Sequence, residues 1–170
     1  MIGRSYHYSI TIRPSIDLFR AIYKRFKETL DLLKESVTDL SYFLIMQPLT
    51  VGFLRKSCEQ WPAGSSNSQG LRPEDGPLLT VLVLPTWSSS KDDELMFSET
   101  EKLMNDIKII SINFGLDHRY IFPNHSWGRQ NILAGYGEER LAELKKTQEK
   151  WDPEGLFQTV IGGGYKISKA

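Results

Sequence analysis

The sequence predicts an α+β domain in which a mostly antiparallel sheet carries helices on one face. Segments with an apolar residue at every second position alternate along the chain with segments whose apolar residues recur every three or four positions. The first strand segment also has one apolar face and one polar face, which parallel sheets seldom show. A parallel α/β sheet is therefore the second choice.

Composition and charge limit the possible partners. At 170 residues the chain fits one domain, which we expect over residues 1–170. Lys plus Arg and Asp plus Glu are 21 each, so no net charge attracts nucleic acid or anionic lipid. Residues 1–8 lack a signal-peptide core, and no run is long enough to cross a bilayer. As written, the chain suggests a cytoplasmic protein without nucleic-acid or membrane partners.

The first two predicted elements show clear periodicity in their apolar residues. Residues 5–13 (SYHYSITIR) predict a half-buried strand, with Tyr6, Tyr8, Ile10 and Ile12 on the dry face. Residues 15–35 predict an amphipathic helix, because apolar side chains recur at three and four positions there. The predicted apolar face of this helix consists of Phe19, Ile22, Phe26, Leu30 and Leu33.

Two continuously apolar segments predict strands that are covered on both faces. They are residues 40–49 (LSYFLIMQPL) and residues 78–87 (LLTVLVLPTW), and each contains a proline near its end. The segment between them, WPAGSSNSQGLRPEDGP, predicts a loop, because it is rich in turn-forming residues.

The second half of the chain predicts two more helices and one strand. Ser90 and Asp93 predict a capping box, and the apolar spacing after it predicts a helix that ends at Gly115. Residues 118–126 (HRYIFPNHS) predict a strand that ends in polar groups, with Tyr120, Phe122 and Asn124 on one side. Residues 138–150 predict a final helix that Pro153 cannot continue.

No motif specifies a reaction by itself. His118 and His125 could be imagined as metal ligands, but at seven residues apart on a strand their rings point to opposite faces, so we expect no metal. Residues 162–164 (GGG) predict a turn, since no strand and helix flank them as in nucleotide-binding loops. The single cysteine, Cys58, excludes an internal disulfide. No serine elbow or nucleophile–base pair supports a hydrolase.

The end of the chain resembles a known family. YIFPNHSWGRQNILAGYG, followed by WDP, FQ and GGYKI, is similar to the C-terminal end of FAD-linked oxidases of the berberine-bridge-enzyme type, especially those of fungi in the vanillyl-alcohol-oxidase superfamily. That family shows Tyr-x-Asn-Tyr-Ala, a Gln, Tyr-Gly, a helix with Leu, Tyr-Asp-Pro, Phe-Gln and Gly-Gly-Phe-Lys-Leu. The matching positions here are Phe122, Asn124, His125, Ser126, Gln130, Tyr136, Gly137, Leu141, Trp151, Asp152, Pro153, Phe157 and Gln158.

The resemblance extends upstream and covers essentially the whole chain. QPL at residues 47–49, SSNSQGL at residues 65–71, and Trp87 with its paired aspartates resemble the family's Gln-Pro-Ile, Gly-Gly-Asn-x-Leu-Gly-Leu and Trp-plus-Asp landmarks. It implies a substrate domain, whose PCMH-type FAD-binding half, with its Gly-Gly-His-Ser loop, would precede these residues. It also implies oxidation of a small organic substrate by hydride transfer to FAD, with reoxidation by oxygen. Many members of the family are secreted.

The resemblance also implies roles for particular residues. Asn124, Gln130 and Tyr136 would contact the cofactor, and Phe122 would contact the substrate. The family often has a Tyr at the position of Phe122 to take the substrate proton, which a phenyl ring cannot do. His125, where the family has Tyr, would be the catalytic base instead. Phe157 would be buried in a docked tail, so that its loss would cost about 3 to 5 kcal/mol.

Three functions stay open from the sequence. The chain could be the C-terminal part of an FAD-dependent oxidoreductase of secondary metabolism. It could also be a flavin-free orphan domain that binds a small molecule or a protein, in which case its uncovered flavin-facing surface would favour self-association. The third choice is an unrelated α+β binding domain. Ser65 and Ser66 also replace the family's Gly-Gly, which makes the backbone of that loop a point to check.

Overall fold

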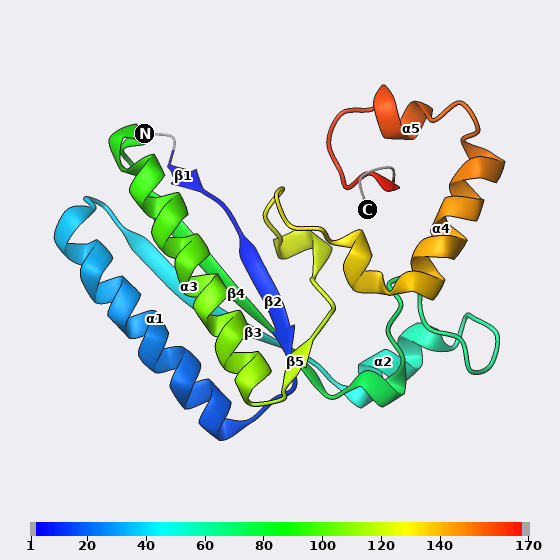
Figure 1. Ribbon diagram of the computed structural model, residues 1–170, viewed down its shortest axis with the longest axis horizontal. Coiled ribbons are helices and arrows are strands. Elements are labelled where there is room, and N and C mark those ends of the chain that lie inside the picture. Colours follow the sequence, from blue (N-terminus) through cyan, green and yellow to red (C-terminus); the bar gives the residue numbers. More distant parts are fainter. Residues whose placement is uncertain (1–2, 168–170) are drawn as a thin grey trace.

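The computed structural model describes residues 3–167 and shows one antiparallel sheet with two long helices on one face (Figure 1). The α+β class predicted from the sequence is confirmed. The elements are β1 (Arg4–Ser5), β2 (Tyr8–Ile12), α1 (Ile16–Ser36), β3 (Ser41–Leu49), α2 (Val51–Cys58), β4 (Leu78–Trp87), α3 (Asp93–Asn113), β5 (Asp117–His118), α4 (Glu138–Trp151) and α5 (Leu156–Thr159). No helix in this described part has the length and hydropathy needed to cross a membrane.

Strand β4 lies inside the sheet. One of its edges pairs with β1 and β2, and the other pairs with β3 along nine residues. Strand β5 extends the sheet beyond β2. Because α1 connects β2 to β3 and α3 connects β4 to β5, the order is β-α-β-β-α-β, with β4 inserted between the strands that α1 joins.

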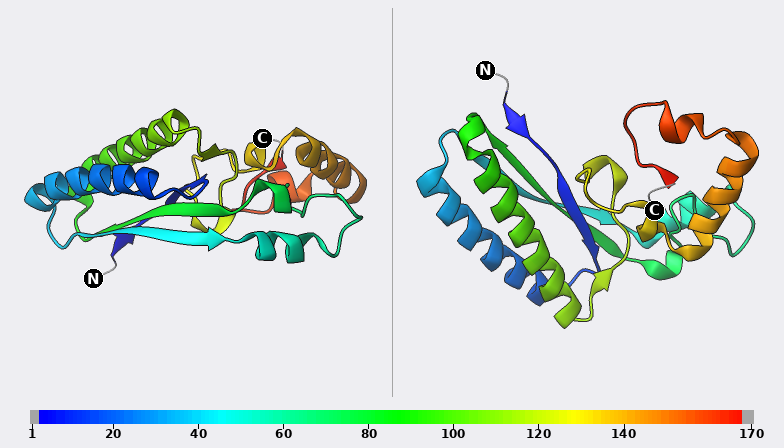
Figure 2. Two further views of the ribbon diagram at one scale, coloured as in Figure 1. Left: turned by 90° about the horizontal axis from the view of Figure 1, so that it is seen from below. Right: turned by 45° about the horizontal axis from the view of Figure 1, so that its top comes forward.

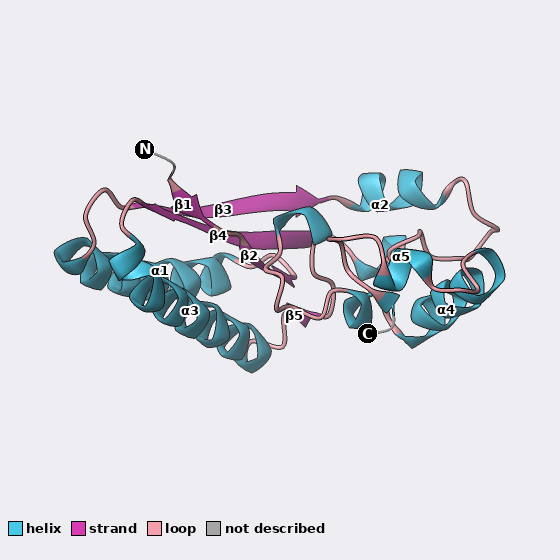
Figure 3. Ribbon diagram, turned by 90° about the horizontal axis from the view of Figure 1, so that it is seen from above, coloured by secondary structure: helices cyan, strands magenta, loops and turns pink. Residues whose placement is uncertain are grey.

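The main core lies between the sheet and the helix pair. Figures 2 and 3 show α1 and α3 side by side on the same side of the sheet. The sheet contributes the buried side chains Ile10, Ile12, Val81 and Val83, and the helices contribute Leu18, Ile22, Phe26, Leu33, Leu103 and Ile107. Within this core Tyr42 stacks on Phe26 and shares a hydrogen bond of 2.9 Å with the hydroxyl of Thr100. The two buried hydroxyl groups thus satisfy each other within the core.

Two strand predictions need correction. Ser9 and Thr11, predicted on the wet face of the first strand, are fully buried, because the chain after α3 returns along this edge of β2. Strand β3 was predicted to be covered on both faces, but it is an edge strand, and Phe43 on its far face is 52% exposed. The edge position also explains why Pro48 is tolerated within it.

The two long helices are confirmed, with changes in detail. Helix α1 begins after Ser15, whose hydroxyl accepts the amide of Leu18, but Phe19 lies outside its buried face. Helix α3 ends before Gly115, which has a φ of 67°. The predicted capping box is wrong, because the carboxylate of Asp93 binds the guanidinium of Arg4 and the indole nitrogen of Trp87 instead. Helix α2 was not predicted.

The polar-ended strand at residues 118–126 is wrong for most of its length. Only Asp117–His118 pairs with the sheet, and Pro123–His125 forms a 3-10 turn. A proline cannot donate to a ladder, and the edge of β2 that this segment would continue is already used by the side chain of Gln130. Helix α4 is confirmed, and Asp152 caps the turn after it by accepting the amides of Leu156 and Phe157.

The predicted burial of the tail is wrong for this chain. Trp151 is 73% exposed and Phe157 is 64% exposed, and the neighbouring Val160 and Ile161 are exposed as well. The turn predicted at residues 162–164 is confirmed, because Gly163 and Gly164 both have positive φ. The tail therefore returns to the protein through its glycine turn and not through the aromatic side chain.

The exposure of Phe157 changes the stability prediction. We expect Phe157→Ala to change the free energy of unfolding by less than about 0.5 kcal/mol, because most of the ring is exposed to water and folding buries little of it. The matched control is Phe26→Ala in the core, which should cost about 3 to 5 kcal/mol. Urea unfolding of both variants measures the difference. Equal losses in the two variants would show that Phe157 is packed in solution.

Candidate functional site

A pocket of about 370 Å³ lies on the sheet face opposite α1 and α3, where β3 leads into α2. Gln47 of β3 and Thr80 of β4 are partners in the register, so their side chains stand side by side on that face. Gln69 and Tyr120 complete the polar lining. The apolar walls are formed by Pro48, Leu49, Phe53, Leu71 and Phe122. We call this the sheet pocket.

Asn67 shapes the loop that forms one wall of the sheet pocket. Its side-chain oxygen accepts the amides of Gln69 and Leu71, each at 3.0 Å, and its side-chain nitrogen donates to the hydroxyl of Ser57 in α2. Asn67 is only 6% exposed, so these bonds replace those that water would make. The loop sequence SSNSQGL thus owes its shape to this asparagine. Ser65 and Ser66 adopt ordinary negative φ, so the missing Gly-Gly pair is no obstacle.

A close backbone approach joins this loop to the segment before α4. A Cβ atom on Gly70 would lie 1.9 Å from the carbonyl oxygen of Tyr136, and Gly70 has a φ of 75°. Gly135 is also restricted, because its Cβ would lie 2.7 Å from the carbonyl oxygen of Arg119. The guanidinium of Arg119 donates to the carbonyl oxygens of Gly70 and Gly135, at 2.6 and 2.5 Å. Two glycines and one arginine therefore hold three segments together around the pocket.

Tyr120 lies at the base of this arrangement and is 1% exposed. Its hydroxyl donates to the side-chain oxygen of Gln69 at 2.8 Å, and its ring stacks on Tyr136. Burial raises the pKa of Tyr120 well above its ordinary value, with a smaller contribution from Tyr136. Tyr120 is therefore a neutral hydrogen-bond donor at any working pH and not a catalytic base.

His118 holds the start of the same segment. Its Nδ1 accepts the amide of Tyr120 at 3.2 Å, and its Nε2 lies 3.4 Å from a carboxylate oxygen of Asp75. Burial lowers the pKa of His118, and Asp75 only partly opposes this shift. The ring is thus a neutral structural group, and it does not meet His125. Within residues 3–167 no group of three or more His, Cys, Asp or Glu side chains is arranged to hold a metal.

Of the residues predicted for substrate and chemistry, Phe122 lines the sheet pocket and His125 lies directly behind it. The ring centroids of Phe122 and His125 lie 5.1 Å apart in an edge-to-face arrangement. The ring centroid of His7 lies 5.3 Å from that of His125. Nδ1 of His125 is buried without a hydrogen-bond partner in the described part of the chain. Burial, with a contribution from His125, lowers the pKa of His7. Asn124 is exposed in the same turn.

Gln130 and Tyr136, the other residues predicted to contact the cofactor, lie apart from the sheet pocket lining. The side-chain amide of Gln130 bonds the amide and the carbonyl oxygen of Ser9 and accepts the amide of Trp127, so it extends the sheet edge as a backbone strand would. Tyr136 faces a second pocket of about 320 Å³ that contains three arginines. Two of these are paired, Arg72 with Glu139 and Arg140 with Glu143, so that pocket has no excess positive charge from them.

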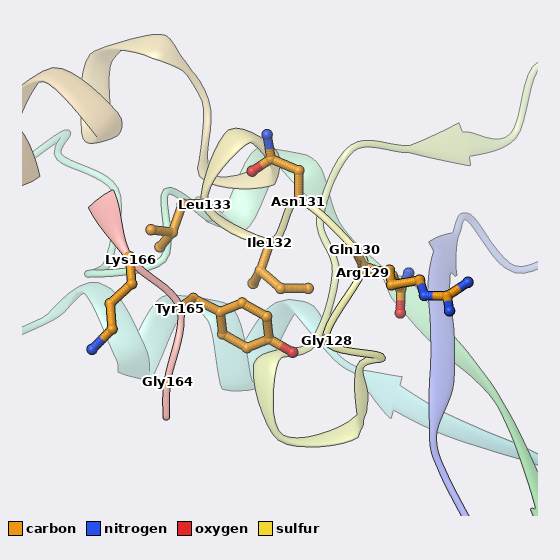
Figure 4. A pocket seen from close by; sticks show the side chains of 9 residues that line it. All are labelled: Gly128, Arg129, Gln130, Asn131, Ile132, Leu133, Gly164, Tyr165 and Lys166. Carbon is orange, nitrogen blue, oxygen red and sulfur yellow. The ribbon is translucent and has the colours of Figure 1, made fainter. Parts of the chain in front are cut away.

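A third pocket, of about 260 Å³, lies between the loop after Trp127 and the returning tail. Figure 4 shows the ring of Tyr165 extending from the tail toward Ile132 and Gly128, while Lys166 points away from them. The hydroxyl of Tyr165 shares a hydrogen bond with that of Ser126. This contact fixes the tail beside the turn that bears Asn124 and His125. The predicted residues therefore lie at three neighbouring places and do not line one cavity.

Sequence reasoning missed the polar residues of the sheet pocket. Gln47 and Gln69 lie within the sequence landmarks of the family resemblance, but their spacing in the sequence does not show that both line one pocket. Tyr120 and Phe122 were placed on one side by alternation, and both do line the pocket. That alternation was the one signal that could have found Tyr120.

Removal of the Asn67 side chain tests the origin of the loop shape. We expect Asn67→Ala to lower the free energy of unfolding by about 2 to 4 kcal/mol, because it leaves buried amides of residues 69 and 71 without an acceptor. Asn105→Ala, at an exposed position of α3, is the matched control and should be neutral. Urea unfolding measures both. A neutral Asn67→Ala would mean that the loop does not depend on this amide.

Several curated proteins that resemble this chain are FAD-dependent monooxygenases of fungi. The chain is 32% identical over 132 residues to the FAD-dependent monooxygenase sdcF of Emericella nidulans, covering 78% of this chain and 27% of that protein. It is 28% identical over 168 residues to the FAD-dependent monooxygenase FUP4 of Fusarium proliferatum, covering 96% of this chain and 32% of that protein. The chain thus spans about a quarter to a third of the monooxygenases it matches.

A further relative has a different name. The oligopeptidase PhomG' of Diaporthe leptostromiformis is 26% identical over 166 residues, which is 96% of this chain but 13% of that protein. Because the match covers only 13% of that protein, it gives no reason to assign peptidase activity to this chain. No family model and no solved structure match the chain. Most of this chain is therefore homologous to part of fungal FAD-dependent monooxygenases.

Proposed function

We propose that this chain is the substrate-domain part of an FAD-dependent oxidoreductase that oxidises a small organic molecule. The observation that carries the proposal is its alignment, over most of its length, with several FAD-dependent monooxygenases of which it spans only a part. The finer assignment to the berberine-bridge-enzyme type, with hydride transfer to flavin and reoxidation by oxygen, rests on the sequence landmarks. In this assignment the FAD-binding part lies outside these 170 residues.

The far face of the sheet fits one side of a flavin ring system. Phe53 at the sheet pocket is 57% exposed, and Phe43 farther along the same face of β3 is 52% exposed. A planar aromatic cofactor is the kind of group that such rings cover. Asn124 is exposed nearby in the turn after Phe122, so its amide can reach an outside group. When bound, the flavin would supply the two-electron acceptor.

His125 is the residue that we propose to accept the substrate proton. The phenyl ring of Phe122 cannot accept a proton, and burial raises the pKa of Tyr120, so that its hydroxyl stays protonated. The His125 side chain is only partly buried, and its Nδ1 has no hydrogen-bond partner in the described part of the chain, so no internal contact already engages that nitrogen. The ring centroid of His125 lies 5.1 Å from that of Phe122, which is itself a residue of the pocket lining.

The exposed tail supports the view that a larger partner surface is needed. Large apolar side chains gather on α4, α5 and the chain after them, at positions Trp151, Leu156, Phe157, Val160 and Ile161. Soluble surfaces seldom show so many neighbouring apolar groups without a partner. We propose that this patch docks on the FAD-binding part. The alternative is a flavin-free binding module, which the same patch would drive to self-association.

A chimera tests the proposal. This chain replaces the matched 27% of the Emericella nidulans monooxygenase, and the purified protein is examined for flavin absorbance. We expect retained flavin, and a loss of at least about tenfold in flavin affinity for Asn124→Ala. Asn113→Ala, at the exposed end of α3, is the control and should bind flavin normally. A folded, monodisperse chimera without flavin would leave the flavin-free module as the better account.

The role of His125 has its own test in the flavin-loaded chimera. With a substrate that reduces its flavin, His125→Ala should slow anaerobic flavin reduction by at least about 100-fold, as expected for loss of a general base. His7→Ala removes the neighbouring ring and should leave this rate within a few-fold of the parent. Unchanged reduction by His125→Ala would remove this residue from the mechanism.

A further inference from the structure

We infer that the sheet pocket selects an uncharged, mainly aromatic or aliphatic molecule that carries a hydroxyl or carbonyl group. This inference rests on the proposed function and gives the chemical class of its substrate. With about 370 Å³, the pocket has the size of sites for small organic ligands.

The lining of the pocket contains no charge. Its nine residues include no Asp, Glu, Lys, Arg or His. An ionised ligand would have to give up its water shell there without a counter-charge, which is costly in a largely apolar site. The nearby pocket at Tyr136 differs in this respect, because it presents arginine and glutamate side chains. The sheet pocket is therefore the one of the two that favours a neutral molecule.

The polar groups of the pocket stand on its floor. Gln47 and Thr80 face the cavity from adjacent strands, and Thr11 continues their row onto β2 as the register partner of Thr80. The hydroxyl of Thr11 is fully buried and has no hydrogen-bond partner in the described residues. A side-chain amide and a hydroxyl offer both donors and acceptors, so they suit a ligand hydroxyl or carbonyl. Gln47 and Thr80 thus mark the end of the pocket at which a polar group of the ligand is bound, while Thr11 lies buried beside them.

The opposite wall of the pocket is held by hydrogen bonds and contains no charged side chain. Tyr120 stays protonated because burial raises its pKa, and its hydroxyl is already bonded to Gln69. Asn67 fixes the backbone on both sides of Gln69. A neutral phenol supplies no positive charge for a carboxylate, and the hydroxyl hydrogen of Tyr120 is already donated to Gln69. Phe53, which is 57% exposed at the rim, supplies an aromatic surface for the ligand to pass or stack on.

Three probes with one ring system test the inference on the 170-residue chain itself. Calorimetric titration compares 2-naphthol, which is neutral and carries a hydroxyl, with 2-naphthoate, which is charged, and with naphthalene, which has no polar group. We expect 2-naphthol to bind at least about tenfold more tightly than 2-naphthoate. Equal or tighter binding of 2-naphthoate, or no binding of 2-naphthol, would overturn the inference.

Two glutamine variants locate the binding. Gln47→Leu should weaken 2-naphthol by about three- to tenfold and leave naphthalene unchanged, because only the former uses the amide. Gln60→Leu, at an exposed position after α2, should change neither. If Gln47→Leu binds 2-naphthol as the parent does, the polar anchor lies elsewhere and the inference fails. These titrations need no flavin, so their failure is distinct from a failure of the chimera to retain FAD.

Discussion

The structure depends on the pairing of β4 on both of its edges. Each of the other strands reaches the sheet through β4 or through its neighbour β2, although α1 and a long loop separate them along the chain. The same strand gives Val81 and Val83 to the helix-covered core and Thr80 to the opposite face. A substitution that breaks this strand would thus remove the core and the pocket together. The two faces of one strand connect stability with the proposed binding site.

The second determinant is the close junction beyond the sheet. Gly70 and Gly135 allow backbone contacts that no side chain would permit, and the guanidinium of Arg119 donates to the carbonyl oxygens of both glycines. Tyr120 and Gln69, which are bonded to each other in the sheet pocket, are the chain neighbours of Arg119 and Gly70 in this junction. Its glycines are needed for backbone reasons and not for contact with a ligand. The family landmark around Asn67 has the same character, because its amide organises the loop.

The proposed function follows from two surfaces that the chain leaves uncovered. One is the far face of β3 beside the sheet pocket, and the other is the apolar patch from Trp151 to the residues after α5. The first surface surrounds a concave cavity with hydrogen-bonding groups. The second consists of exposed aromatic and aliphatic side chains. The first suits a small molecule and a flat cofactor, and the second suits a protein surface.

The sequence by itself determined the α+β class, both long helices, β4 and the turn at residues 162–164, because local periods and glycine positions decide such elements. It also indicated a resemblance to FAD-linked enzymes, and the relatives named FAD-dependent monooxygenases support the use of FAD in this group. Only the tertiary structure decided that Ser9 and Thr11 are buried, that Phe157 is exposed, and that Gln130 serves the sheet edge. Each of these depends on which segments, distant in sequence, come to lie beside the residue. A local period records which side chains share a face, but it holds no information on what covers that face.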